Sequence, residues 1–127
     1  MLTCPCGSGK AVTACCDLYI NQGQSAPTAE ALMRSRYTAY TLANIDYIAR
    51  TMKGPAAVDF QPQEAENFAR SVTWNKLEVL NSTPGLTQAF VEFRAHYTFR
   101  NHPEVIHEKS EFHFEDGAWY YTDRSQY

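Results

Sequence analysis

The spacing of the hydrophobic residues changes once along the chain. After the N-terminal cysteines, apolar side chains recur every three or four residues, which predicts helices. We expect a first helix that begins at the cap Thr28, a short second helix capped by Asp46, and a third helix over residues 62–72. The N-terminal half is therefore predicted to be helical.

In the second half, apolar and polar residues alternate, which predicts strands with one buried face. The longest run covers residues 87–100, where every second residue from Ala89 onward is apolar. Further strands are expected around residues 77–79, 105–115 and 118–123. Helices followed by a four-strand antiparallel meander indicate an α+β fold, in which a long curved sheet wraps the first helix.

A two-residue hairpin turn determines which residues of the last two strands share a face. Counting outward from Asp116-Gly117 places Ser110 opposite Asp123, on the same face as the aromatic residues of both strands. The aromatic residues must face the core, so Ser110, Asp123 and also Glu108 are predicted to face inward. Buried carboxylates are costly unless a partner neutralises them.

The partner is expected on the first helix, whose apolar stripe contains Arg36, Tyr37 and Tyr40. Two interpretations stay open. In one, Arg36 and the inward carboxylates form a buried ion-pair network that fixes the helix against the sheet. In the other, the same groups line a partly polar ligand cavity. The candidates for this cavity are Arg36, Tyr37, Tyr40, Glu108, Ser110 and Asp123.

The histidines support neither a catalytic pair nor a metal site. By strand parity His96, His107 and His113 fall on outer faces, and His102 lies in a turn. A His-Asp pair therefore has no candidate inside the fold. Three outward imidazoles on separate strands do not converge on one ion.

Composition and charge narrow the class of protein. The chain has 127 residues, which is enough for one ordinary domain, and 20% of them are charged. A formal net charge of −3 provides no basic field for nucleic acid or acidic lipid. The first residues hold four thiols and no apolar segment, so they do not form a secretory signal. We expect a cytoplasmic protein with no membrane partner and no nucleic-acid partner.

All four cysteines lie within a short N-terminal segment. A disulfide-stapled fold would spread its cysteines around the core, and the cytosol keeps thiols reduced. Zinc accepts four thiolates at tetrahedral corners, which Cys4 and Cys6 on a tight knuckle and Cys15-Cys16 on a following turn can supply. A redox-active thiol cluster and a disulfide pair are the alternatives. We expect structural Zn²⁺, because four thiolates leave no open coordination position.

The cysteine segment resembles the SEC-C motif, named for the C-terminus of the translocation ATPase SecA. Cys4-Pro5-Cys6-Gly7-Ser8-Gly9-Lys10 followed by Cys15-Cys16 matches the four positions through which that motif binds zinc. Together with Leu32-Met33-Arg34-Ser35-Arg36-Tyr37 and Trp119-Tyr120-Tyr121, the chain resembles the YchJ family. Many members of that family carry a second SEC-C motif, which has no match in residues 124–127.

The resemblance implies two units. The first is a SEC-C zinc motif over residues 1–22. The second is a nuclear-transport-factor-two-like domain over residues 28–127, in which a cone of curved sheet has helices covering its mouth. Sheets of this kind often dimerise across the open face, so a homodimer is also expected.

Two functions from different classes follow. The first is a binding or adaptor protein, in which the zinc knuckle recruits a protein partner. The SecA resemblance implies a partner from the export or translation machinery. The second is a small-molecule enzyme of the isomerase or hydrolase type, in which Arg36 holds an anion and Glu108 or Asp123 acts as base.

Overall fold

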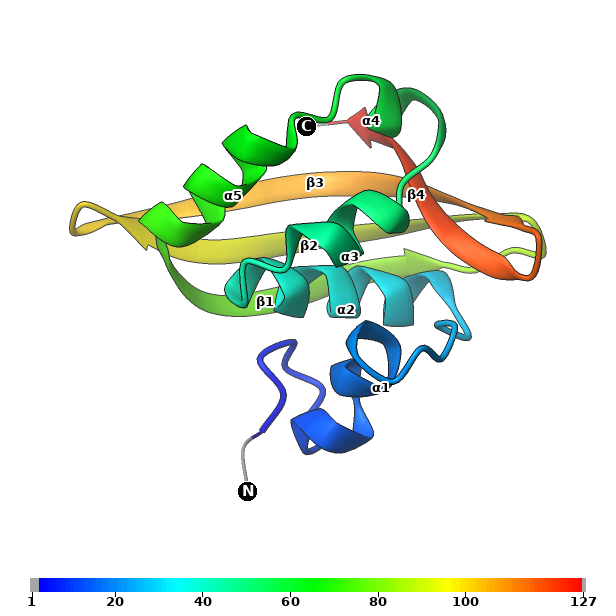
Figure 1. Cartoon of the computed structure of the whole chain (residues 1–127), viewed down its shortest axis with the longest axis horizontal. Coiled ribbons are helices and arrows are strands. Elements are labelled where there is room, and N and C mark those ends of the chain that lie inside the picture. Colours follow the sequence, from blue (N-terminus) through cyan, green and yellow to red (C-terminus); the bar gives the residue numbers. More distant parts are fainter. Residues whose placement is uncertain (1–2, 127) are drawn as a thin grey trace.

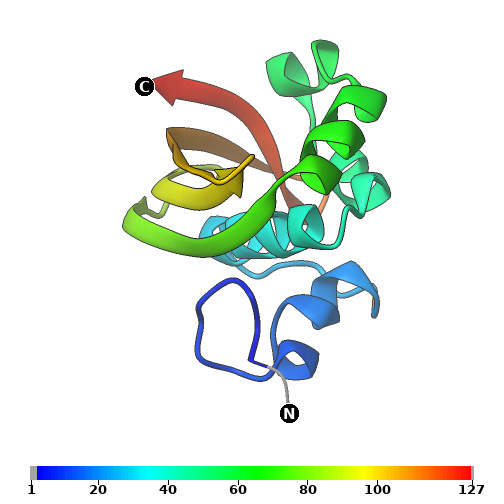
Figure 2. The ribbon, with the colours of Figure 1, turned by 90° about the vertical axis from the view of Figure 1, so that its left-hand side faces the viewer.

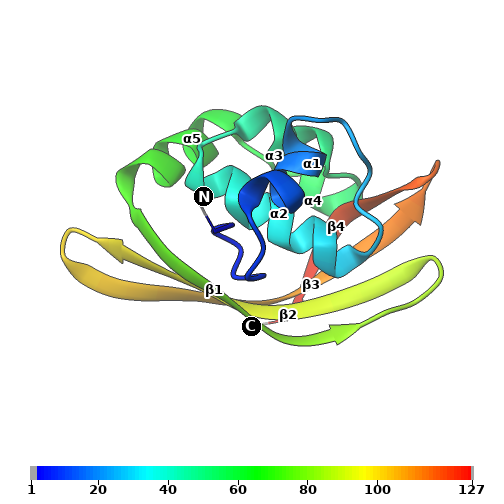
Figure 3. The ribbon, with the colours of Figure 1, turned by 90° about the horizontal axis from the view of Figure 1, so that it is seen from below.

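The four strands form one curved antiparallel sheet, and the helices lie along its concave side (Figure 1, Figure 3). The computed structural model describes residues 3–126, with side-chain burial described as far as residue 124. The strands follow one another in the order β1-β2-β3-β4. Their bounds are β1 (Thr73–Thr83), β2 (Gln88–Phe99), β3 (His102–Glu115) and β4 (Ala118–Gln126). This is the expected α+β meander.

The helices precede the sheet in the chain. They are α1 (Cys16–Ile20), α2 (Ala29–Thr41), α3 (Ile45–Arg50), α4 (Gly54–Val58) and α5 (Pro62–Ser71), with a 3₁₀ turn η1 (Val12–Ala14) before them. Thr28 caps α2 as predicted, since its side chain accepts a hydrogen bond from the backbone N–H of Ala31 at 3.0 Å. The prediction that Asp46 caps the second helix is wrong. Asn44 caps α3 instead and leaves Asp46 in the first turn.

Helix α2 lies at the centre of the molecule. Met33 and Tyr37 line the space between the helix and the sheet. Leu32 is buried, and Ser35 and Ala39 are completely buried as well. A helix that is buried on all sides belongs to the core rather than to the surface. Viewed from the side, α2 lies between the sheet and the N-terminal segment (Figure 2). Cys4, Cys6 and Cys16 belong to the same continuous hydrophobic cluster as the sheet.

A one-residue bulge changes the predicted register of the last hairpin. Phe112 pairs with Tyr121 as expected, but Glu111 then pairs with Asp123, so Thr122 is the extra residue in β4. Thr122 is buried, and its hydroxyl donates to the Glu111 carbonyl at 3.2 Å. The prediction that Asp123 lies opposite Ser110 and faces inward is wrong, because the bulge turns Asp123 out to solvent.

The two expected units share one core. The connector between residues 22 and 28 leads directly into the cap of α2. Positions 1, 2 and 127, at the outer ends of the two expected units, lie outside the described residues. Within residues 3–126, no helix combines the length and the apolar character that crossing a membrane requires.

The cap of α2 supports a test of how strongly the fold depends on this helix. We expect Thr28→Ala to lower the free energy of unfolding by about 1 kcal/mol, since the Ala31 N–H loses its partner. Urea unfolding followed by circular dichroism measures this. Thr87→Ala, at an exposed position in a loop, is the control and should change nothing. Equal stability of the two variants would contradict the assigned role of the cap.

Candidate functional site

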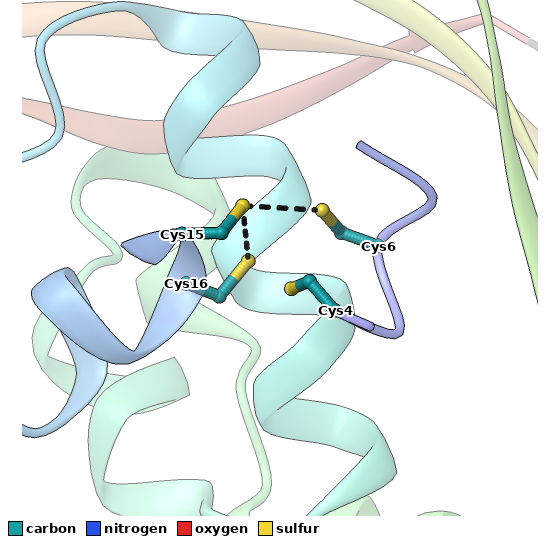
Figure 4. A group of neighbouring side chains, drawn as sticks. All are labelled: Cys4, Cys6, Cys15 and Cys16. Carbon is teal, nitrogen blue, oxygen red and sulfur yellow. Dashed lines mark hydrogen bonds between the residues drawn. The ribbon is translucent and has the colours of Figure 1, made fainter. Parts of the chain in front are cut away.

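Four cysteine side chains converge beside α2 (Figure 4). Their sulfur atoms all lie within 4.8 Å of one another. The Sγ atoms of Cys6 and Cys15 are 3.7 Å apart, and those of Cys15 and Cys16 are 4.0 Å apart. Tetrahedral thiolates at the zinc–sulfur distance of about 2.3 Å would lie about 3.8 Å from one another. The donor set and its spacing therefore fit a tetrahedral metal ion.

The backbone of the N-terminal loop holds this arrangement. An antiparallel bridge joins Thr3 to Ala11, and the Cys4 N–H donates to the Lys10 carbonyl at 2.8 Å. Gly7 has a φ of 82°, a conformation that residues with a β-carbon adopt only under strain. The tight loop brings the first two sulfurs to the start of α1, where the Cys15-Cys16 pair completes the set.

Neighbouring thiols within the cluster shift one another's pKa values in opposite directions. Hydrogen bonding from Cys16 lowers the pKa of Cys6 to about 4, so this thiolate forms first. The same hydrogen bond, together with burial, raises the pKa of Cys16, and burial raises the pKa of Cys15. Among the thiols alone, a second and third negative charge are strongly disfavoured. A divalent ion removes this obstacle, because it binds the thiolate form.

The metal knuckle, defined as residues 3–16, is attached to α2 by polar contacts. Arg34 Nη1 donates to the Cys6 carbonyl at 2.7 Å, and its Nε pairs with Glu30 at 3.0 Å. On the next turn of the helix, Thr38 Oγ1 lies 3.7 Å from Cys4 Sγ. Sequence reasoning missed Arg34, because its partner is a backbone carbonyl.

A separate cavity of about 210 Å³ lies between α2, α5 and the concave face of the sheet. Five of the six predicted cavity residues line it, namely Arg36, Tyr37, Tyr40, Glu108 and Ser110. The sixth, Asp123, is exposed and does not line the cavity. Tyr121 also lines it and was not among the candidates.

The position of Arg36 differs from the predicted ion-pair network. Its Nη1 donates to the Ile48 carbonyl at 2.9 Å and to Thr51 Oγ1 at 2.7 Å, and its Cζ lies 4.7 Å from the ring centroid of Tyr121. The last carbonyls of α3 lack partners within the helix and form the negative end of its dipole, so they attract a cation. The expected direct ion pair of Arg36 with Glu108 is therefore wrong.

Glu108 finds hydroxyl partners instead. Its Oε2 accepts hydrogen bonds from Ser110 Oγ and, at 3.0 Å, from the hydroxyl of Tyr121. Burial and the neighbouring charge of Glu108 raise the pKa of Tyr121, so that phenol remains a hydrogen-bond donor. Burial lowers the pKa of Arg36 from its ordinary value. An arginine remains charged even so.

Aromatic side chains form one wall of the cavity. The ring of Trp74 lies 5.8 Å from that of Tyr37, 5.9 Å from that of Tyr40 and 5.7 Å from that of Phe68, measured between centroids. These distances are typical of favourable aromatic pairs. Sequence reasoning missed Trp74 and Phe68 as cavity residues. A signal was present, because both are large aromatic residues close to the boundary between the third predicted helix and the first strand.

The histidines of the sheet are oriented as parity predicted. On β2 and β3, His96, His107 and His113 alternate with the buried residues and lie on the convex face. Each forms a pair with a glutamate: Glu78 at 2.5 Å, Glu92 at 2.8 Å and Glu111 at 2.8 Å, respectively. Within residues 3–126, the cysteine cluster is the one group of side chains found close enough together to hold a metal ion.

Comparison with solved structures supports both parts of this description. The solution structure of a SEC-C motif containing protein from Rhodopseudomonas palustris matches with a TM-score of 0.91 and 32% identity, over 99% of each chain. The crystal structure of a SEC-C motif containing protein from Psychrobacter arcticus matches with a TM-score of 0.82 and 31% identity, over 100% of this chain and 85% of the other.

Sequence relatives and a family model agree with the structures. A UPF0225 protein from Geobacter sulfurreducens is 42% identical over 123 residues, which cover 94% of this chain and 76% of the relative. A UPF0225 protein from Streptomyces coelicolor is 37% identical, over 94% of this chain and 92% of the relative. The model of the YchJ middle NTF2-like domain matches residues 28–124. With its cysteine cluster, sheet and helices in the same arrangement, the chain belongs to the YchJ family.

Proposed function

We propose that this protein binds a small molecule in the cavity, while a structural zinc ion in the knuckle holds α2 in place. The observation that carries the proposal is the cavity itself, which has a charged end and an aromatic wall. Ligand sites are typically apolar hollows with a few convergent polar groups. If Arg36 and Glu108 formed a direct ion pair, their charges would neutralise each other and the cavity would have no charged end. Instead, each lines it separately.

Zinc is supported by the chemistry of the knuckle. Four thiolates at tetrahedral spacing favour zinc or iron over harder ions, and four protein ligands are the rule for structural zinc sites. A zinc ion bound by four thiolates carries a net charge of −2, and the guanidinium of Arg34, which donates to the Cys6 carbonyl, provides positive charge close by. Zinc bound here would supply folding energy to a segment too short for its own core.

The knuckle also has a face that a protein partner could use. Pro5, Gly7, Gly9 and Lys10 are exposed, although Cys4 and Cys6 between them are buried. An adaptor role would place its contact at this loop. Binding of a protein partner at this loop is compatible with ligand binding in the cavity, and neither role requires the other.

Catalysis in the cavity is the second candidate function. Glu108 lies beside two hydroxyl groups in a cavity that a substrate could enter, so it could act as a base toward a bound molecule. Consumption of a bound ligand by the wild type, but not by Glu108→Gln, would favour an isomerase or hydrolase.

Metal analysis tests the zinc site. We expect one zinc per chain, and about 2.7 kcal/mol of added stability at a free zinc concentration of 100 times Kd. Cys16→Ser should abolish both effects, since it removes a buried ligand. Mg²⁺, which prefers oxygen ligands, is the control ion. A protein whose unfolding is indifferent to zinc and to chelators would contradict the structural role.

The attachment of the knuckle to α2 gives a second test. We expect Arg34→Met to lower the free energy of unfolding by about 1–2 kcal/mol and to speed zinc transfer to a chelator, because the Cys6 carbonyl loses a charged donor. Arg70→Met is the matched control, since Arg70 makes the same i,i+4 pair with Glu66 on α5 and is remote from the knuckle. Identical behaviour of the two variants would disprove the attachment.

Ligand binding is tested by a thermal-shift screen of small metabolites on the zinc-loaded protein. We expect ligands that stabilise the wild type but not Ala65→Leu, because Ala65 lines the cavity and the larger side chain fills it. Ala57→Leu, on the exposed face of α4, should leave binding intact. If Ala65→Leu binds the same ligands as the wild type, binding occurs elsewhere and the proposal fails.

A further inference from the structure

The cavity contains one cation and one anion that do not meet. Arginine has five N–H donors, and Arg36 uses only the two on Nη1 within the described part of the chain. Glu108 accepts the hydrogen bonds of Ser110 and Tyr121 through Oε2, which leaves Oε1 without a hydrogen-bond partner among the described side chains. No buried side-chain nitrogen or oxygen of the described residues lacks a partner, so the unbonded N–H groups of Arg36 and Oε1 of Glu108 reach the solvent of the cavity and are available to a ligand. The two groups are thus arranged to hold something between them.

The opposite charges of Arg36 and Glu108 restrict the class of ligand that can bind between them. An anion attracted to Arg36 would be repelled by Glu108, and a cation attracted to Glu108 would be repelled by Arg36. A neutral group avoids both penalties if it presents an acceptor to the guanidinium and a donor to the carboxylate. A carbonyl next to an N–H does this, and each hydrogen bond is then assisted by a full charge.

The aromatic wall and the size restrict the rest of the ligand. Tyr37, Tyr40, Phe68 and Trp74 offer ring faces and edges that favour a flat aromatic partner. The volume of about 210 Å³ is below the 300–1,000 Å³ of typical drug-sized sites, so one or two rings fill it. Water could occupy the charged end, but the ring carbons of Phe68 and Trp74 offer it no hydrogen-bond partner.

We propose that the cavity selects a small, neutral, planar ring that carries a carbonyl beside an N–H, as in an aromatic amide or a lactam-type heterocycle. Arg36 donates to the carbonyl oxygen, Glu108 Oε1 accepts from the N–H, and the ring lies against the Trp74 wall. This rests on the proposed function, since it names the ligand class of the same cavity.

Three probes of one shape test the proposal on the zinc-loaded full chain. Benzamide has both the acceptor and the donor, benzoate is an anion without the donor, and benzamidinium is a cation without the acceptor. We expect benzamide to bind at least about tenfold more tightly than either, as measured by isothermal titration or by chemical-shift changes. Tightest binding by benzoate or by benzamidinium overturns the proposed ligand class but leaves small-molecule binding intact. No binding by any of the three, together with an empty metabolite screen, overturns the proposed function as well.

A variant that removes the charge of Glu108 tests whether this carboxylate recognises the ligand, or whether the cavity binds any aromatic ring equally well. In Glu108→Gln we expect benzamide to bind about tenfold more weakly and benzoate to bind more tightly, because the negative charge is gone and the size is kept. Glu115→Gln makes the same chemical change at an exposed position on the same strand and should alter neither. An unchanged ranking in Glu108→Gln contradicts the proposal. If this variant does not fold, the ranking of the three probes on the wild type still decides.

Discussion

Helix α2 must be covered on every side, and this requirement shapes the rest of the molecule. The sheet covers one side through its curvature, and α3 covers another, where Ser35 bonds the hydroxyl of Tyr47 at 2.7 Å. The remaining side is left to about fifteen N-terminal residues, which are too few to form a core of their own. Four sulfurs close enough to hold one metal ion lie in that short segment, and contacts of Arg34 and Thr38 hold it against the helix. The metal knuckle is therefore part of the main core rather than an appendage.

The same helix determines the polarity of the cavity. An arginine within an apolar stripe needs compensation, and Arg36 obtains it from the Ile48 carbonyl and the Thr51 hydroxyl at the end of α3. Glu108 is compensated independently by Ser110 and Tyr121. Because each charge is satisfied on its own side, the cavity between them stays open. A direct ion pair would have closed it and fixed the helix with no room for a ligand.

The order of elements and most strand faces could be predicted, since both follow from residue periodicity. The Thr28 cap was also accessible, because capping depends on residues close in sequence. The failure at Asp123 has a physical reason: a bulge at Thr122 costs little in a hairpin and leaves no trace in the alternation of apolar residues. Arg36 was placed on the correct face, but its partner was not found. Backbone carbonyls at helix ends are acceptors that side-chain reasoning does not count.

The burial of α2 beneath the knuckle also bears on how the protein behaves when handled. If the thiols are oxidised or no ion is bound, the knuckle loses the constraint that would hold Cys4 against the buried Thr38. The sheet, whose strands are joined by backbone hydrogen bonds, does not depend on the sulfurs in this way. The first species to appear would keep its β-structure while displaying a strip of uncovered helix. Molecules could then associate through that exposed strip, so the solubility of the protein would depend on its metal content. Protein that has lost the metal would precipitate before the circular dichroism signal of its strands decreases.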